Sequence, residues 1–325
     1  MNRRAFLTTV GGSLLAAPLA VEAQPTGKVY RVGVVLEGGP YYAAIDGMRD
    51  GLKDIGLEDG RHYILQIRDM KGSLGGIAAA AKGLESENVN LIYAIATTVA
   101  KAVQGATTKV PIVFYAGSDP VENGLVSSFA RPGGRLTGVH SRNTVLTAKR
   151  LDILKEILDR HSLRVLTFYD STNPIVGGYA KVAREAARQL RIALIERSVR
   201  SVDDLREGLQ RLKPGEVDAL FVLDSMVTSQ AALIVDTATA KKLPTMFYER
   251  TSVAAGGLAS YGTSYYAAGR LAAKYVRQVL LGTSPADLPV ERSERFELVI
   301  NLKTAKALGL TIPPSLLRRA DQIIE

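Results

Sequence analysis

The sequence predicts an α/β protein made of two doubly wound parallel-sheet units. Continuous apolar runs alternate with segments in which apolar residues recur every three or four positions, as in buried strands and amphipathic helices. This alternation runs up to a turn at residues 131–134 and a short strand, and then begins again at residue 145. With 325 residues, the chain is long enough for two domains with a core each.

The first unit contains five apolar runs that favour strands. We expect these strands at residues 29–36, 64–67, 91–96, 111–116 and 136–140, with helices at 41–55, at 77–84 and after Thr97. In the helix at 41–55, Ile45, Met48 and Leu52 fall on one face, which is typical of a helix packed on a sheet.

The second unit repeats the pattern without repeating the sequence. We expect helices at 145–158, 175–190, 202–212 and 227–241, and strands at 164–169, 192–197, 217–223 and 245–248. Ligands of open parallel sheets bind beyond the carboxyl ends of the strands. Two such sheets facing each other offer one shared cleft, which suits a hinge-closing trap for a small solute or a two-domain enzyme.

Residues 1–23 have the features of an export signal. Arg3 and Arg4 precede a short, weakly apolar run, and a small-x-small motif ends at Ala23. The run is too short to cross a bilayer, which takes roughly 20 residues. The Arg pair with Phe6 and Leu7 resembles a twin-arginine signal, although a general secretory signal is the alternative. We expect cleavage near Ala23 and a periplasmic protein.

Composition argues against several classes of function. The chain has no Cys and three His, so no thiol chemistry and no Cys- or His-rich metal site is expected. The net charge is +9, but the basic residues are scattered, so no nucleic-acid binding is expected. Tyr (13 residues) outnumbers Phe (7), and some Tyr hydroxyls could line a polar cavity.

The common enzyme motifs are missing. The sequence has no G-x-S-x-G elbow and no Walker loop, and Gly38 and Gly39 after the first strand do not form a dinucleotide fingerprint. No pair of carboxylates is spaced for acid–base work. We therefore expect a binding protein that is not an enzyme and carries no cofactor or metal.

Polar residues follow six of the expected strands. They are Glu37, Thr97 with Thr98, and Gly117 with Ser118 and Asp119 in the first unit, and residues 170–173, Asp224 with Ser225, and Glu249 with Arg250 in the second. Hydroxyls and N–H groups there can bind a carboxylate, and the acidic side chains can bind an amine. The alternative is helix capping, which the same residue types perform at the same positions.

Eight segments carry a resemblance to a known family. They are residues 47–56 (GMRDGLKDIG), 106–113 (ATTKVPIV), 118–126 (SDPVENGLV), 131–139 (RPGGRLTGV), 149–158 (KRLDILKEIL), 256–269 (GGLASYGTSYYAAG), 285–290 (PADLPV) and 296–313 (FELVINLKTAKALGLTIP). In these the chain resembles the ABC-transporter substrate-binding proteins with a type I periplasmic-binding fold, a group that includes binders of tryptophan and other aromatic solutes.

The resemblance implies two lobes joined by a three-strand hinge. The crossovers are expected near residues 140–143, 261–264 and 287–290. One lobe then contains residues 28–142 and 263–288, and the other contains residues 143–262 and 289–325.

The resemblance also implies ligand contacts. In the first lobe these are Glu37, Tyr41, Thr97, Thr98, Gly117 and Ser118, and in the second they are Tyr169, Thr172, Asn173, Asp224, Ser225 and Glu249. The tryptophan binders have Thr where this chain has Ser118, and an Asn within the segment that here spans residues 224–227. An amino acid, an aromatic acid and another small organic anion all stay open as ligands.

The implied function is the periplasmic solute-binding component of an ABC importer. It would close on an amino-acid-like or aromatic solute and deliver it to an inner-membrane permease and its ATPase, and we expect it to be a monomer. A ligand-sensing module for a membrane receptor is an alternative, and an exported α/β enzyme is a further one.

Overall fold

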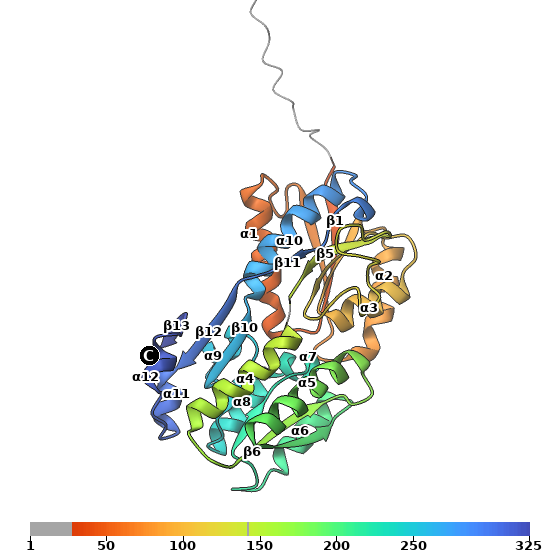
Figure 1. Ribbon diagram of the computed structural model, residues 1–325. Helices are drawn as coiled ribbons and strands as arrows, with labels where there is room; N and C mark the ends of the chain where they lie inside the picture. Colours follow the sequence, from red (N-terminus) through yellow and green to blue (C-terminus); the bar gives the residue numbers. More distant parts are fainter. Residues whose placement is uncertain (1–27, 142) are drawn as a thin grey trace, which may run out of the picture.

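The computed structural model describes residues 28–141 and 143–325, which form two lobes, one above the other in Figure 1. The sheet of the first lobe has the strand order β11-β5-β4-β3-β1-β2, and all neighbouring strands are parallel. Its strands are β1 (Tyr30–Leu36), β2 (Tyr63–Asp69), β3 (Leu91–Ile95), β4 (Ile112–Ala116), β5 (Leu136–His140) and β11 (Glu291–Arg292).

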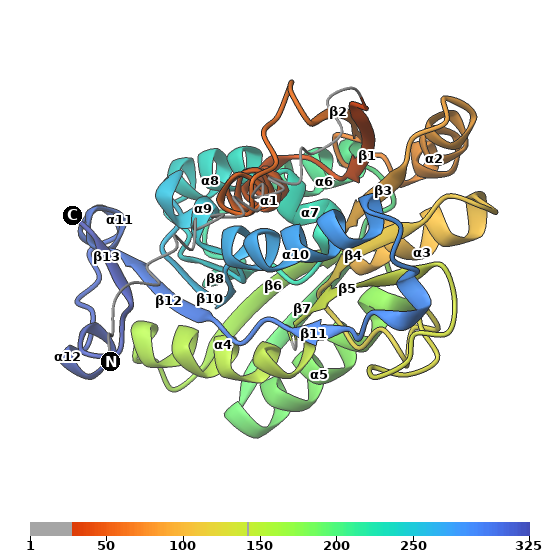
Figure 2. The same cartoon turned by 90° about the horizontal axis from the view of Figure 1, so that it is seen from above.

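Helices cover both faces of this sheet. They are α1 (Tyr42–Asp54), α2 (Ile77–Ser86), α3 (Thr97–Ala106) and α10 (Tyr265–Leu280), with the short 3-10 turns η1 (Gly39–Tyr41), η2 (Leu74–Gly76) and η3 (Pro285–Asp287). Helix α10 comes from late in the chain but packs against α1, β3, β4 and β5, and it runs beside α1 in Figures 1 and 2.

The second sheet has the order β13-β12-β10-β9-β8-β6-β7, and only the β10–β12 pair is antiparallel. Its strands are β6 (Leu163–Tyr169), β7 (Ile192–Ser198), β8 (Ala219–Phe221), β9 (Thr245–Phe247), β10 (Ala259–Thr263), β12 (Phe296–Asn301) and β13 (Gln322–Ile324). Its helices are α4 (Asn143–Leu158), α5 (Pro174–Leu190), α6 (Val202–Gln210), α7 (Ser225–Ser229), α8 (Ala231–Ala240), α9 (Arg250–Ala254), α11 (Leu302–Ala307) and α12 (Pro314–Leu317). Figure 2 shows α4 and α5 on one face, with α6, α7 and α8 on the other.

Two doubly wound parallel sheets were expected. The structure confirms two doubly wound sheets, and they are parallel except at the β10–β12 pair. In both sheets the strand order reverses beside the first strand of the unit: β1 lies between β2 and β3, and β6 lies between β7 and β8. A reversal of this kind leaves a crevice at the carboxyl ends of the central strands. The two crevices face each other across the gap between the lobes.

The chain passes between the two sheets three times, after β5, after β10 and after β11. The third crossover was expected at residues 287–290, with a lobe limit at residue 288, and this is wrong by a few residues. The amide N–H of Val290 donates to the Phe129 carbonyl, and that of Ser293 donates to the His140 carbonyl. Strand β11 therefore still belongs to the first sheet, and two residues are too few to show a strand period in the sequence.

The expected export signal, residues 1–23, lies outside the described residues. Within residues 28–141 and 143–325, no helix has the length and apolar character needed to cross a bilayer.

Close packing of α1 against α10 depends on glycine. A Cβ atom on Gly269 would lie 2.0 Å from the carbonyl oxygen of Ala44, and one on Gly47 would lie 2.0 Å from that of Tyr266. These neighbours are backbone atoms and cannot rotate away. The two helices would have to separate to admit a single methyl group.

We therefore expect Gly269→Ala to lower the free energy of unfolding by about 3 kcal/mol, because overpacking at a helix contact forces backbone shifts. Gly178→Ala on α5 is the matched control, since nothing lies within 4 Å of its Cβ position. That variant should gain about 0.5–1 kcal/mol from reduced backbone freedom. Urea denaturation measures both, and equal effects would contradict the packing argument.

Candidate functional site

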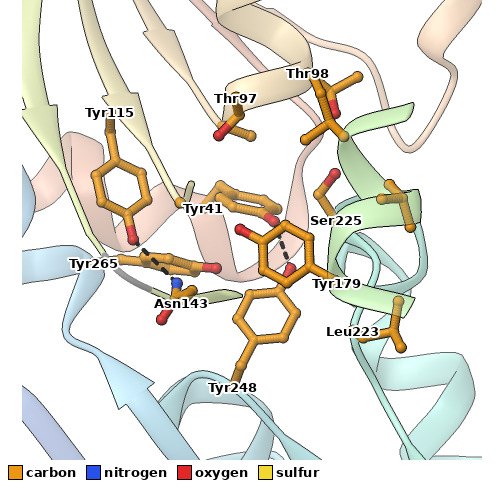
Figure 3. A pocket seen from close by; sticks show the side chains of 14 residues that line it. Tyr41, Thr97, Thr98, Tyr115, Asn143, Tyr179, Leu223, Ser225, Tyr248 and Tyr265 are labelled. Atoms are coloured by element: carbon orange, nitrogen blue, oxygen red, sulfur yellow. Dashed lines mark hydrogen bonds between the residues drawn. The ribbon is translucent and has the colours of Figure 1, made fainter. Parts of the chain in front are cut away.

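A small cavity lies between the lobes at the carboxyl ends of their strands (Figure 3). Its volume is about 40 Å³. It is lined by Tyr41, Ala96, Thr97, Thr98, Tyr115, Gly117 and Tyr265 from the first lobe, and by Asn143, Ile175, Val176, Tyr179, Leu223, Ser225 and Tyr248 from the second. A cavity of about 150 Å³ binds benzene, so this gap holds no aromatic ring beyond those of the protein.

Five tyrosines line the cavity, and Figure 3 shows them converging from both lobes. The rings of Tyr41 and Tyr265 stack at 4.9 Å between centroids, and Tyr115 and Tyr248 meet Tyr265 edge-on at 5.5 and 6.5 Å. Burial raises the pKa of Tyr41, Tyr115, Tyr248 and Tyr265 above the ordinary value. Their hydroxyls therefore stay protonated and can donate hydrogen bonds.

The lobes touch directly across the gap. The hydroxyls of Tyr41 and Tyr248 are 2.8 Å apart and hydrogen-bonded. Further side-chain contacts join the lobes. Ser225 Oγ donates to Glu37 Oε1 at 2.9 Å, Asn173 Nδ2 donates to Thr98 Oγ1 at 3.3 Å, and Gln230 Nε2 donates to the Lys71 carbonyl at 3.2 Å.

Backbone segments of the two lobes also meet, where η1 packs on α7. Gly39 has a φ of 57°, and a Cβ atom there would lie only 2.6 Å from the carbonyl oxygen of Ser229. The Gly38–Gly39 turn thus brings the first lobe against the second.

Two buried carboxyl groups lie beside the cavity. Glu37 is fully buried, and its Oε2 has no hydrogen-bond partner among the described residues. Burial raises the pKa of Glu37 to about 8, the nearby Asp224 carboxyl adds to this shift, and the Ser225 hydroxyl opposes it. Burial also raises the pKa of Asp224 to about 6, although backbone N–H groups partly stabilise its ionised form.

A buried cation lies beside the first two crossovers, on the side of the cavity that we call the hinge side. Arg150 on α4 is fully buried, and no carboxylate of the described residues forms an ion pair with it. Its Nε donates to the Tyr261 carbonyl at 2.7 Å, and one terminal nitrogen donates to the Asn143 carbonyl at 2.9 Å. Its guanidinium carbon lies 5.4 Å from the centre of the Tyr248 ring. Burial lowers the pKa of Arg150 to about 10, so the group stays charged at neutral pH.

Of the twelve residues expected at the ligand site, five line the cavity: Tyr41, Thr97, Thr98, Gly117 and Ser225. Four others lie directly behind this wall. Glu37 accepts from Ser225, Ser118 Oγ donates to Thr97 Oγ1 at 3.0 Å, Asn173 contacts Thr98, and Asp224 is buried beside Ser225.

The remaining three do not reach the cavity. The Tyr169 hydroxyl donates to Glu196 on β7, and the Thr172 hydroxyl donates to Asp170. Glu249 accepts from the amides of Thr251 and Ser252 and thereby caps α9. Asn173 and Asp224 also cap helices, α5 and α7. Helix capping, the alternative raised from the sequence, therefore describes Asn173, Asp224 and Glu249. The hydrogen bonds of Glu249 all go to residues of α9.

Sequence reasoning missed most of the aromatic wall. Tyr115, Tyr179, Tyr248 and Tyr265 line the cavity with Asn143, and none of them was named from the sequence. The excess of Tyr over Phe was the one available signal, and it does not say which tyrosines converge. Tyr115 is inside a strand and Tyr179 is on a helix, so neither is a residue that follows a strand end.

The buried Glu37 carboxyl makes stability depend on pH. In the unfolded chain a Glu loses its proton near pH 4.3, whereas in the folded protein Glu37 keeps it to about pH 8. Between these values the folded state binds the extra proton, so the free energy of unfolding falls as pH rises from about 4.5 to 8. Urea denaturation from pH 5 to 8.5 should show this fall, and Glu37→Gln should make it shallower.

The exposed Glu122→Gln serves as the control for this measurement and should keep the wild-type pH dependence. Glu37→Gln with an unchanged slope would show that the carboxyl is not buried in solution.

Comparison with known proteins agrees with this architecture. The family model described as "ABC transporter substrate binding protein" matches residues 30–324. A protein named "Tyrosine-binding protein" from Clostridioides difficile is 28% identical over 265 residues, which cover 81% of this chain and 76% of that protein.

Two solved structures with related sequences differ in similarity; one is a ligand complex and the other is described as ligand-free and open. An ABC domain from Streptococcus pneumonia in complex with L-Trp has a TM-score of 0.80 at 26% identity and covers 91% of this chain and 100% of that chain. The ligand-free, open structure of a substrate-binding protein with adhesive properties from Clostridium difficile has a TM-score of 0.60 at 25% identity, with 91% and 99% covered. The lower score for the open structure agrees with the interlobe contacts described above. The expected type I periplasmic binding fold is confirmed, and the chain belongs to the ABC transporter substrate binding protein family.

Proposed function

We propose that this chain is the periplasmic solute-binding component of an ABC importer, and that it captures a small organic solute, amino-acid-like or aromatic, by closing its two lobes. The observation that carries the proposal is the cavity between the strand ends, which draws half of its wall from each lobe. A site divided in this way is complete only when the lobes are together. Binding and closure are then one event.

The residues that line the cavity also support an aromatic or amino-acid-like solute as the ligand. Tyrosine rings offer flat apolar faces, and their hydroxyls offer donors, a combination suited to an aromatic solute with a polar end. Two proteins with related sequences point to aromatic amino acids: one is named a tyrosine-binding protein, and the other was solved in complex with L-Trp.

Opening is required for entry, because the present gap of about 40 Å³ is too small for an aromatic ring. The Tyr41–Tyr248 hydrogen bond, which bridges the gap, must break as the ligand enters. An ordinary hydrogen bond contributes about 0.5–1.5 kcal/mol net, so this contact is weak enough for a ligand to replace.

The solute then passes to a permease and its ATPase. Residues 1–23 direct export, and the mature protein acts as a monomer.

Titration of the purified protein with amino acids, aromatic acids and nucleosides tests the proposal. We expect one class to give a calorimetric binding isotherm and a raised melting temperature, since a ligand at a hundredfold its Kd stabilises by about 2.7 kcal/mol. A panel with no heat and no stabilisation would count against a binding function.

Closure itself is tested by Gly39→Ala. A Cβ atom there meets the Ser229 carbonyl only when the lobes are together. Overpacking of about 1–3 kcal/mol should weaken ligand binding by about 5- to 150-fold. X-ray scattering should show a larger radius of gyration for the ligand-bound variant than for the ligand-bound wild type.

Gly215→Ala is the matched control. Gly215 also has a positive φ, 73°, but nothing lies within 4 Å of its Cβ position. This variant should suffer the same kind of backbone strain and bind the ligand as the wild type does. If both variants bind equally, the η1–α7 contact does not limit closure.

A further inference from the structure

The Arg150 guanidinium, which has no carboxylate partner among the described residues, lies behind the wall of the cavity, and the proposed function gives it no role. Its donors reach both of the first two crossovers: the Asn143 carbonyl, where α4 begins after β5, and the Tyr261 carbonyl on β10. The side chain therefore ties the two crossovers together. It does so from a site without access to water, where an unpaired charge is costly.

Arg150 also determines which way the Asn143 side chain faces. The Asn143 Oδ1 lies 3.4 Å from an Arg150 terminal nitrogen and 3.4 Å from the Thr263 hydroxyl, and both of these groups can donate to it. The oxygen of the amide is thus held on the protein side. The Nδ2 group then points toward the Tyr115 hydroxyl, 3.5 Å away, on the wall of the cavity (Figure 3).

The consequence is a donor on the cavity wall with a positive charge directly behind it. Tyr248, whose ring lies against the guanidinium, is itself part of the wall, so one layer of side chains separates the charge from the cavity. Such a layer contains little water, and the field of the charge is weakly screened across it. No carboxylate of the described residues lies within ion-pair distance to cancel it.

We propose that the hinge side of the cavity is a subsite for an anionic ligand group, a carboxylate, in which Asn143 Nδ2 is the donor and Arg150 is the positioning residue behind it. This inference rests on the proposed function, since it assigns one end of the same solute. It also assigns the solute's orientation: the carboxylate faces the hinge, and the remainder of the molecule faces Ser225 and Thr98.

Pairs of probes that differ only at the carboxylate test the subsite. L-tyrosine is compared with L-tyrosinamide, and L-tryptophan with L-tryptophanamide, by calorimetry at pH 7 and low salt. We expect the wild type to bind the acid of the better pair at least about tenfold more tightly than its amide. This first comparison needs no variant.

Asn143→Asp is the decisive variant. It places a carboxylate beside Arg150, cancels the unpaired charge and replaces the donor by an acceptor, while keeping the size of the side chain. Because it gives the buried guanidinium a partner, it should fold at least as well as the wild type. We expect its preference for the acid over the amide to fall at least about tenfold. Asn90→Asp, at a half-buried position of the first lobe far from the cavity lining, is the matched control and should keep the wild-type preference.

Variants of Arg150 distinguish the effect of its charge from the effect of its hydrogen bonds to the two crossovers. Arg150→Lys keeps the charge but cannot reach both crossovers, so its preference for the acid should stay within about threefold of the wild type even if both affinities drop. Arg150→Met removes the charge and should lose the preference. If the residue only braced the hinge, every variant would change the two affinities in parallel.

The outcomes are distinct. Equal binding of acid and amide by the wild type, or an unchanged preference in Asn143→Asp, would overturn the subsite and leave the solute-binding function standing. Binding of neutral or cationic solutes alone would do the same. Absence of binding across the whole panel would overturn both proposals.

Discussion

The position of the site follows from one constraint: in a parallel sheet every strand points the same way, so the residues after the strands share one edge. In this protein two such edges face each other. Residues far apart in sequence, such as Glu37 after β1 and Ser225 after β8, meet there although they lie in different lobes. A polar group that is buried between the two lobes at these positions needs a hydrogen-bond partner, because leaving it without one is costly.

The contacts between the lobes give only some of these buried polar groups a hydrogen-bond partner. The hydroxyls of Tyr41 and Tyr248 bond to each other, and Ser225 bonds to Glu37. The second Glu37 oxygen has no hydrogen-bond partner among the described residues, and Arg150 has no carboxylate there. Under the proposed function, a solute that supplies the missing partners would gain more than the weak bonds it replaces. In that case, selectivity would come from these polar groups without partners more than from the shape of the cavity.

Much of the architecture could be predicted from the sequence, because buried strands and amphipathic helices have distinct periods. The strands at 91–96 and 111–116 match β3 and β4 closely. The third crossover could not be predicted, since β11 has only two residues and is held by main-chain bonds to Phe129 and His140. At the site, residues directly after strands, such as Thr97, were found. Tyr179 and Arg150 lie on the sides of helices, where their direction depends on how α4 and α5 pack, and no local pattern reports this.

The close contact of α10 with α1 has a consequence for how the chain folds. Gly269 and Ala44 touch across more than two hundred residues of sequence, and everything between them includes most of the second lobe. The first lobe thus lacks one of its covering helices until synthesis has passed residue 280. Contacts so distant in sequence slow folding and leave apolar surface uncovered in the meantime. The amino-terminal lobe, although begun first, is completed only after most of the carboxyl-terminal lobe has been made.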